Sequence, residues 1–122
     1  MISEEVALAF AGSTIKSVWT LELLFMLHEN PARSWSTDRL IRELRSSRVV
    51  VAQAIAELQR AKLIRESEDG GIGYAAGSEE IARMVDELKK IYATKPVAVV
   101  RAIASAPNEK LRLLSDAFKI KD

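Results

Sequence analysis

The sequence predicts a mainly α-helical domain that carries one small β-hairpin. Two observations lead to this class. Apolar residues recur at steps of three and four over most of the chain, and Asp69 and Gly70 lie between two extended segments. The length of 122 residues suits one domain with a core of its own. Because the chain has no cysteine, we expect neither disulfides nor thiolate metal ligands.

The first two helices are expected to begin at serine residues. Ser3 is a suitable cap for a short helix that runs through Phe10. Ser13 is a suitable cap for the next helix, which runs to about Glu29 and is apolar over a wide face, as a central core helix would be. Pro31 ends this second helix.

Two shorter amphipathic helices are expected to follow. Ser36 or Thr37 caps the third helix, residues 45–47 interrupt the pattern, and a fourth helix begins near Ser47. In both helices the apolar residues share one face at 100° per residue. The expected inward residues are Leu40, Ile41, Leu44, Val51, Ala54, Ile55, Leu58 and Ala61.

The spacing of the apolar residues changes after Lys62 from a helical pattern to an extended one. Residues 63–67 and 72–75 flank an Asp-Gly turn, which predicts a two-stranded hairpin. Ser78 then caps a helix with a clean apolar stripe, and further helices are expected at 96–105 and from Pro107 onward. We expect this stripe to form a dimer seam, with ordinary core packing as the alternative. Its residues are Ile81, Met84, Val85, Leu88, Ile91 and Tyr92.

Positive charge is concentrated in one part of the chain. The whole chain carries a net charge of +1, but residues 31–65 hold eight basic and three acidic residues, a net charge of +5. The preceding residues carry −3 and the following residues −1. A basic patch of this kind is typical of a protein with a polyanionic partner, although a solvated helical face accounts for the charge equally well.

The order of these elements is that of a winged helix-turn-helix with a C-terminal helical extension. Residues 35–74 resemble that superfamily. Residues 17–24 (SVWTLELL) and 42–47 (RELRSS) look like small bacterial regulators, broadly MarR-like. In the run 58–64 (LQRAKLI), Lys62 stands where such regulators usually have glycine. We expect a winged helix-turn-helix domain at residues 1–76 and a C-terminal dimerisation extension at residues 77–122.

The arrangement suits double-stranded DNA, since an α-helix fits the major groove. Arg48 can reach a guanine edge or a phosphate, Gln53 can contact adenine, and Val49 or Ala52 can touch a thymine methyl group. The arginines that precede the fourth helix are better placed for backbone phosphates. The expected DNA-contacting residues are Arg39, Arg42, Arg45, Ser46, Ser47, Arg48, Val49, Ala52 and Gln53.

Two features favour the alternative of a protein-interaction module. The predicted hairpin at residues 63–75, which is the wing of this fold, carries Glu66, Glu68 and Asp69, and these carboxylates would repel phosphates. The outward face of the fourth helix is poor in polar side chains, because Val49 and Ala52 offer little hydrogen bonding. We expect a dimeric, sequence-specific DNA-binding transcription regulator, with a winged-helix protein-interaction module without specific DNA binding as the alternative.

Other classes of function have little support. His28 is the only histidine, and it has no evident catalytic partner or metal-ligand companions, so we expect no enzyme, no cofactor and no metal site. No apolar run is long enough to span a membrane, and Glu4 and Glu5 stand where a secretory signal would need basic residues. We therefore expect a cytoplasmic protein, and from the apolar stripe at residues 81–92 we expect a homodimer. The apolar segment 96–105 could line a small-molecule effector pocket or simply fill the space between helices.

Overall fold

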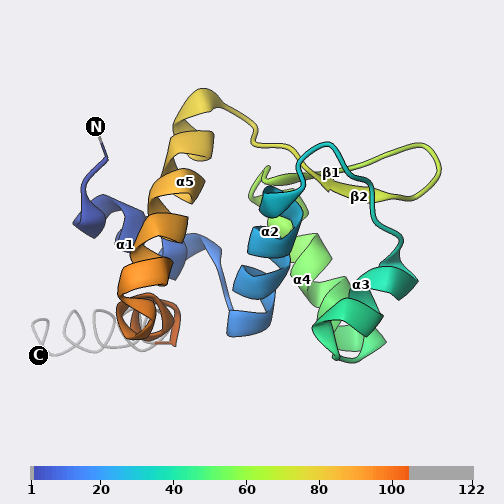
Figure 1. The fold of residues 1–122 in the computed structure, drawn as a ribbon, viewed down its shortest axis with the longest axis horizontal. Helices are drawn as coiled ribbons and strands as arrows, with labels where there is room; N and C mark the ends of the chain where they lie inside the picture. Colours follow the sequence, from blue (N-terminus) through green and yellow to red (C-terminus); the bar gives the residue numbers. More distant parts are fainter. Residues whose placement is uncertain (1, 105–122) are drawn as a thin grey trace, which may run out of the picture.

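The computed structural model describes residues 2–104 of the chain (Figure 1). Residues 96–104 are helical, after the last of the bounded elements. In chain order these elements are α1 (Glu4–Thr14), α2 (Val18–Glu29), α3 (Thr37–Leu44), α4 (Arg48–Arg60), β1 (Ile64–Glu66), β2 (Ile72–Tyr74) and α5 (Glu79–Thr94). The predicted class, mainly α with one β-hairpin, is confirmed.

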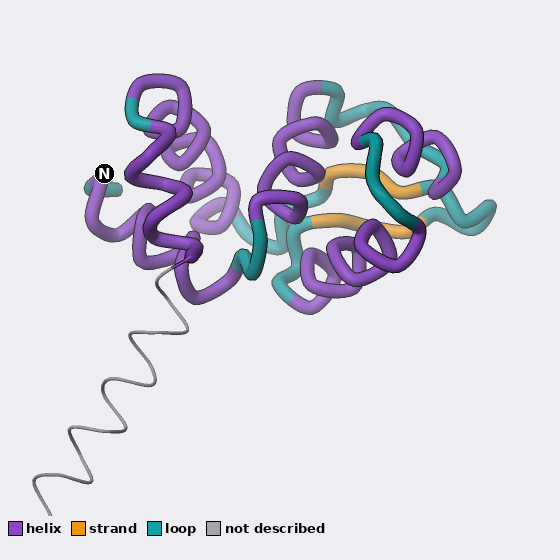
Figure 2. Tube along the Cα trace, turned by 90° about the horizontal axis from the view of Figure 1, so that it is seen from below, coloured by secondary structure: helices purple, strands orange, loops and turns teal. Residues whose placement is uncertain are grey.

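The elements form two halves that share one core. In one half, α3, α4 and the hairpin pack around α2, and in the other α1 packs along α5 (Figure 2). The turn between β1 and β2 projects from the end of the molecule that lies away from α1 and α5 (Figure 1). The shared core takes fully buried side chains from all five helices, among them Ala7, Leu23, Leu27, Leu40, Leu58 and Leu88.

Four helix starts lie where the sequence predicts them. The side-chain oxygens of Ser3, Ser36, Ser47 and Ser78 each accept a hydrogen bond from the backbone N–H three residues later, at 3.1–3.2 Å. Each bond satisfies one of the N–H groups that have no partner within the helix. The caps predicted at Ser3 and Ser78 are confirmed, Ser36 is the cap of the two residues predicted for α3, and the helix predicted to begin near Ser47 is capped by Ser47.

The predicted boundary between the first two helices is wrong. Ser13 lies inside α1, which continues past Gly12 to Thr14, and Ser17 caps α2 by accepting from the N–H of Thr20 at 3.2 Å. Ile15, in extended conformation between the two helices, is fully buried. One isolated glycine costs a helix only about 1 kcal/mol relative to alanine, so burying the surrounding side chains outweighs it.

The hairpin is antiparallel, with Ile64 paired to Tyr74 and Glu66 to Ile72. Trp35 adds a bridge to its edge, because the backbones of Trp35 and Ile72 exchange hydrogen bonds of 2.8 and 2.7 Å. Trp35 itself is buried. The connection that precedes α3 is thereby fixed to the wing.

The side chain of Asp69 stabilises the turn at the tip of the wing. It accepts hydrogen bonds from the Ser67 hydroxyl at 2.6 Å and from the Gly71 N–H at 3.0 Å. Gly70 has a φ of 85°, which glycine adopts without strain. This is the turn that the Asp-Gly pair predicts.

The apolar stripe of α5 faces the core of its own chain. Val85, Leu88 and Ile91 are buried, and the ring of Tyr92 lies 5.5 Å from that of Phe25 on α2. The other residues of the stripe, Ile81 and Met84, are half-buried. The division of the chain at residue 76 stays a prediction, but α1 packs on α5 and therefore belongs spatially with the C-terminal half. The helix predicted from Pro107 lies outside the described residues.

Candidate nucleic-acid interface

The turn between α3 and α4 is built from three residues with separate roles. Arg45 ends α3 in the left-handed conformation, with a φ of 53°, and its N–H donates to the carbonyl of Arg42. Ser46 follows, its N–H donating to the Ile41 carbonyl at 3.3 Å, and Ser47 caps α4. Since both helices are anchored by buried residues such as Leu40 and Val51, the start of α4 is held at a defined angle to α3.

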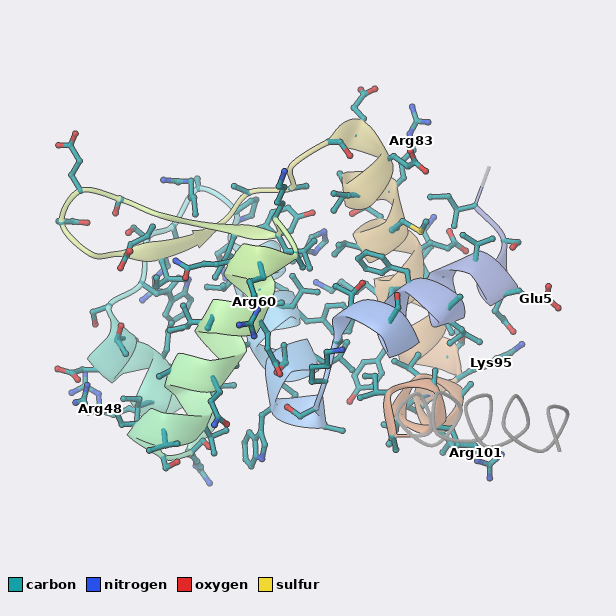
Figure 3. The ribbon with its side chains drawn as sticks, turned by 180° about the vertical axis from the view of Figure 1, so that it is seen from behind. Glu5, Arg48, Arg60, Arg83, Lys95 and Arg101 are labelled. Carbon is teal, nitrogen blue, oxygen red and sulfur yellow. The ribbon has the colours of Figure 1, made fainter. Side chains whose placement is uncertain are left out.

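The first two turns of α4 present the predicted contact residues to solvent. Val49 is 66% exposed, and Arg48, Ala52 and Gln53 are exposed beside it at helical spacing. Ser47 is exposed as well, whereas Ser46 is half-buried. Arg48 lies at the end of the molecule opposite Lys95 and Arg101 (Figure 3). The helix end predicted to enter DNA is therefore exposed to solvent.

The arginines around this helix end differ in their partners. Arg39 donates through Nε to Glu43 at 2.9 Å, and Arg48 donates through Nη2 to Asp38 at 2.8 Å. The second pair connects the start of α4 to the start of α3, and no local pattern in the sequence predicts it. Arg42 and Arg45 are exposed, and among residues 2–104 no carboxylate lies within ion-pair distance of either.

A hollow of about 540 Å³ separates this helix end from the wing. Its charged groups are Asp38, Arg48 and Asp69. The hydrogen bonds from Ser67 and from the Gly71 N–H lower the pKa of Asp69, so its carboxylate is ionised at neutral pH. Two carboxylates and one guanidinium thus share the hollow, which makes it a poor receptor for a phosphate group.

The connection that precedes α3 has a basic side chain that the predicted site does not include. The guanidinium of Arg33 lies 3.7 Å from the ring centroid of Trp35, in cation–π contact. An arginine two residues before a tryptophan in an extended segment is the only sequence signal for this contact, since alternate side chains point to the same side. Glu66 and Glu68 remain exposed, as the prediction of an acidic wing requires.

Within residues 2–104, His, Asp and Glu side chains do not gather in groups of three that could hold a metal ion. In the same part of the chain, no helix is both long and apolar enough to cross a membrane.

The architecture matches that of a known regulator. A solved structure of a MepR mutant from S. aureus superposes with a TM-score of 0.53 and 15% sequence identity, over 92% of this chain and 88% of that chain. MepR is a MarR-family winged-helix regulator. The chain has the winged-helix fold. At this identity the likeness shows the fold alone. Neither the scan against protein-family models nor the search of curated proteins found a match.

Proposed function

We propose that the chain is a sequence-specific, DNA-binding transcription regulator that acts as a homodimer in the cytoplasm. The observation that carries the proposal is the exposed start of α4, which presents Arg48, Val49 and Gln53 to solvent. Next to it lie Arg42 and Arg45, which have no carboxylate partner among residues 2–104. The winged-helix fold shared with MepR supports it.

Each exposed group has a role on DNA. The start of α4 enters the major groove, where Gln53 contacts adenine and Val49 a thymine methyl group. Arg42 and Arg45, at the end of α3 and in the turn, bind backbone phosphates and make the affinity depend on salt. Arg39 joins them once it is released from Glu43.

Selection of duplexes from a random library, followed by fluorescence anisotropy, tests the proposal. We expect the wild type to enrich one motif. Replacing both Arg42 and Arg45 with alanine should weaken binding to all duplexes alike. Arg83→Ala, which removes one positive charge from α5, should leave binding unchanged, because Arg83 lies away from α4 (Figure 3). Absence of binding at low salt to any duplex overturns the proposal.

The dimer interface has to use side chains that the core of one chain leaves open. Because Val85, Leu88 and Ile91 are buried, a second copy would contact the half-buried part of the predicted seam. Val6 on α1 and Val97 after α5, 46% and 63% exposed, are further exposed apolar side chains in the same half of the molecule. Light scattering after size exclusion should give about twice the 13.5 kDa of one chain, and a mass near 13.5 kDa excludes the dimer.

Binding of a protein through α4 is the second candidate function. It is favoured by the apolar outer face of α4, where Val49 is 66% exposed and Ala52 lies on the same side. If this candidate is right, a pull-down should recover one stoichiometric protein partner with the wild type and should not recover it with Val49→Glu. The wild type should then bind no duplex at low salt. Ala93→Glu, which introduces the same charge at an exposed neutral residue of α5, is the control.

A further inference from the structure

The side chain of Arg48 is held across the helix-turn-helix by Asp38. Arg48 is the first residue of α4, and Asp38 is the second residue of α3. Their 2.8 Å hydrogen bond joins two side chains that are each 70% exposed. Exposed ion pairs contribute little to folding stability, at most about 1 kcal/mol. The position of this pair, at the helix end that would meet DNA, gives it a different significance.

Asp38 is the anchored member of the pair. It lies in the first turn of α3, where the partial positive charge of the helix favours a carboxylate. Ser36 caps that turn, and the buried Leu40 fixes α3 to the core. Arg48 extends from α4 on a long side chain with several rotatable bonds. Hence Asp38 restricts Arg48, and the conformational freedom that arginine would otherwise lose on binding is already reduced.

The charges around Arg48 disfavour a phosphate partner. The carboxylate of Asp38 neutralises its guanidinium, and Asp69 lines the same hollow. A phosphate placed at Arg48 would meet both carboxylates, whereas Arg42 and Arg45 have no carboxylate within ion-pair distance in the described part of the chain. One hydrogen bond to Asp38 still leaves four of the five guanidinium N–H donors for directional contacts.

We propose that Asp38 is a positioning residue that restricts Arg48 to a base edge, so that this pair selects one guanine in the binding site. The inference rests on the proposed DNA-binding function and deepens it. Guanine is the expected base, because its O6 and N7 accept two parallel N–H groups from one guanidinium. Without Asp38, Arg48 would move to the nearest phosphate, which carries no sequence information.

The test compares Asp38→Asn with Glu43→Gln. Both changes remove one negative charge from α3 and release one arginine, but only the first releases Arg48. The measurement is the ratio of affinities for the selected duplex and for duplexes in which each G·C pair is replaced in turn. We expect Asp38→Asn to lower this ratio roughly tenfold at one G·C position, equivalent to about 1.4 kcal/mol. We expect Glu43→Gln to leave every ratio unchanged.

Two further measurements separate positioning from a general effect of charge. Both variants should bind random duplex more tightly, and the slope of log affinity against log salt should steepen by about one per chain, or about two for a dimer, as the released arginine takes a phosphate. In an Arg48→Ala background, Asp38→Asn should have no further effect on any ratio. Asp38→Ser, which keeps a residue suited to the first turn of α3, should reproduce the loss of discrimination.

The outcomes are distinguishable. The inference is overturned if Asp38→Asn leaves all ratios unchanged, or lowers them equally with and without Arg48, while the wild type still selects a motif. If the wild type binds no duplex at all, the proposed function and the inference are both overturned.

Discussion

Replacing Lys62 with glycine should stabilise the protein. Lys62 connects α4 to β1 with a φ of 61°, in the left-handed region. A residue with a Cβ pays about 1–2 kcal/mol there, and glycine does not. The greater freedom of glycine in the unfolded chain offsets about 0.5–1 kcal/mol of this gain. The expected net effect of Lys62→Gly is a stabilisation of about 0.5–1 kcal/mol.

Lys62→Ala is the matched control, because it removes the same charge and the same side-chain stem but keeps the Cβ and its strain. The stem packs near the chain at Gly77, whose N–H donates to the Lys62 carbonyl at 2.8 Å. We therefore expect Lys62→Ala to be no more stable than the wild type. Urea denaturation measures the difference, and thermal unfolding should show a midpoint about 2–5 °C higher for Lys62→Gly. If the glycine variant is no more stable than the alanine variant, the reasoning from backbone strain is wrong.

Three further predictions concern single side chains. Ser47→Ala removes the cap of α4 and should lower the free energy of unfolding by about 1 kcal/mol in urea denaturation; an unchanged midpoint would contradict the cap's role. The buried hydroxyl of Tyr74 has no hydrogen-bond partner among the described residues, and burial, then the Asp86 carboxylate, raise its pKa. Tyr74→Phe should therefore equal the wild type in stability or exceed it by up to about 1 kcal/mol, and should lack the loss of stability that the wild type shows as the pH rises above 10. Because the pKa of Asp69 is lowered from its ordinary value of 3.8, the ionised carboxylate stabilises the fold above pH 3.8, and this stabilisation is lost as the pH falls below that value. The melting temperature of Asp69→Asn should therefore depend less on pH between about 5 and 2 than that of the wild type. Parallel pH profiles of the two proteins would refute this.

Local signals predict most of the fold. A serine before an amphipathic run marks four of the five bounded helices, because the cap is satisfied within three residues of the chain. The boundary between α1 and α2 is different, since Ser13 and Ser17 both precede apolar residues. The burial of Ile15 between the two helices decides it. That burial depends on packing against distant parts of the chain, which a local pattern does not contain.

The candidate site divides in the same way. Helical spacing predicts the exposure of Val49, Ala52 and Gln53, because it depends only on α4. The Arg39–Glu43 pair, four residues apart on one helix, is also visible in the sequence. The pair between Asp38 and Arg48 depends on the angle between two helices and on the left-handed residue at the turn. It appears only once the tertiary structure is known.

The positive charge available to DNA is smaller than the net charge of residues 31–65 indicates. Arg39 and Arg48 are each paired with a carboxylate of α3, so Arg42 and Arg45 carry most of the free positive charge at the candidate interface. Two neutralised phosphates per chain correspond to a slope of log affinity against log salt of about −2, or about −4 for a dimer. A much steeper slope for the wild type would mean that the two pairs open on DNA. Arg48 would then leave Asp38 and bind a phosphate instead of being held at a base edge.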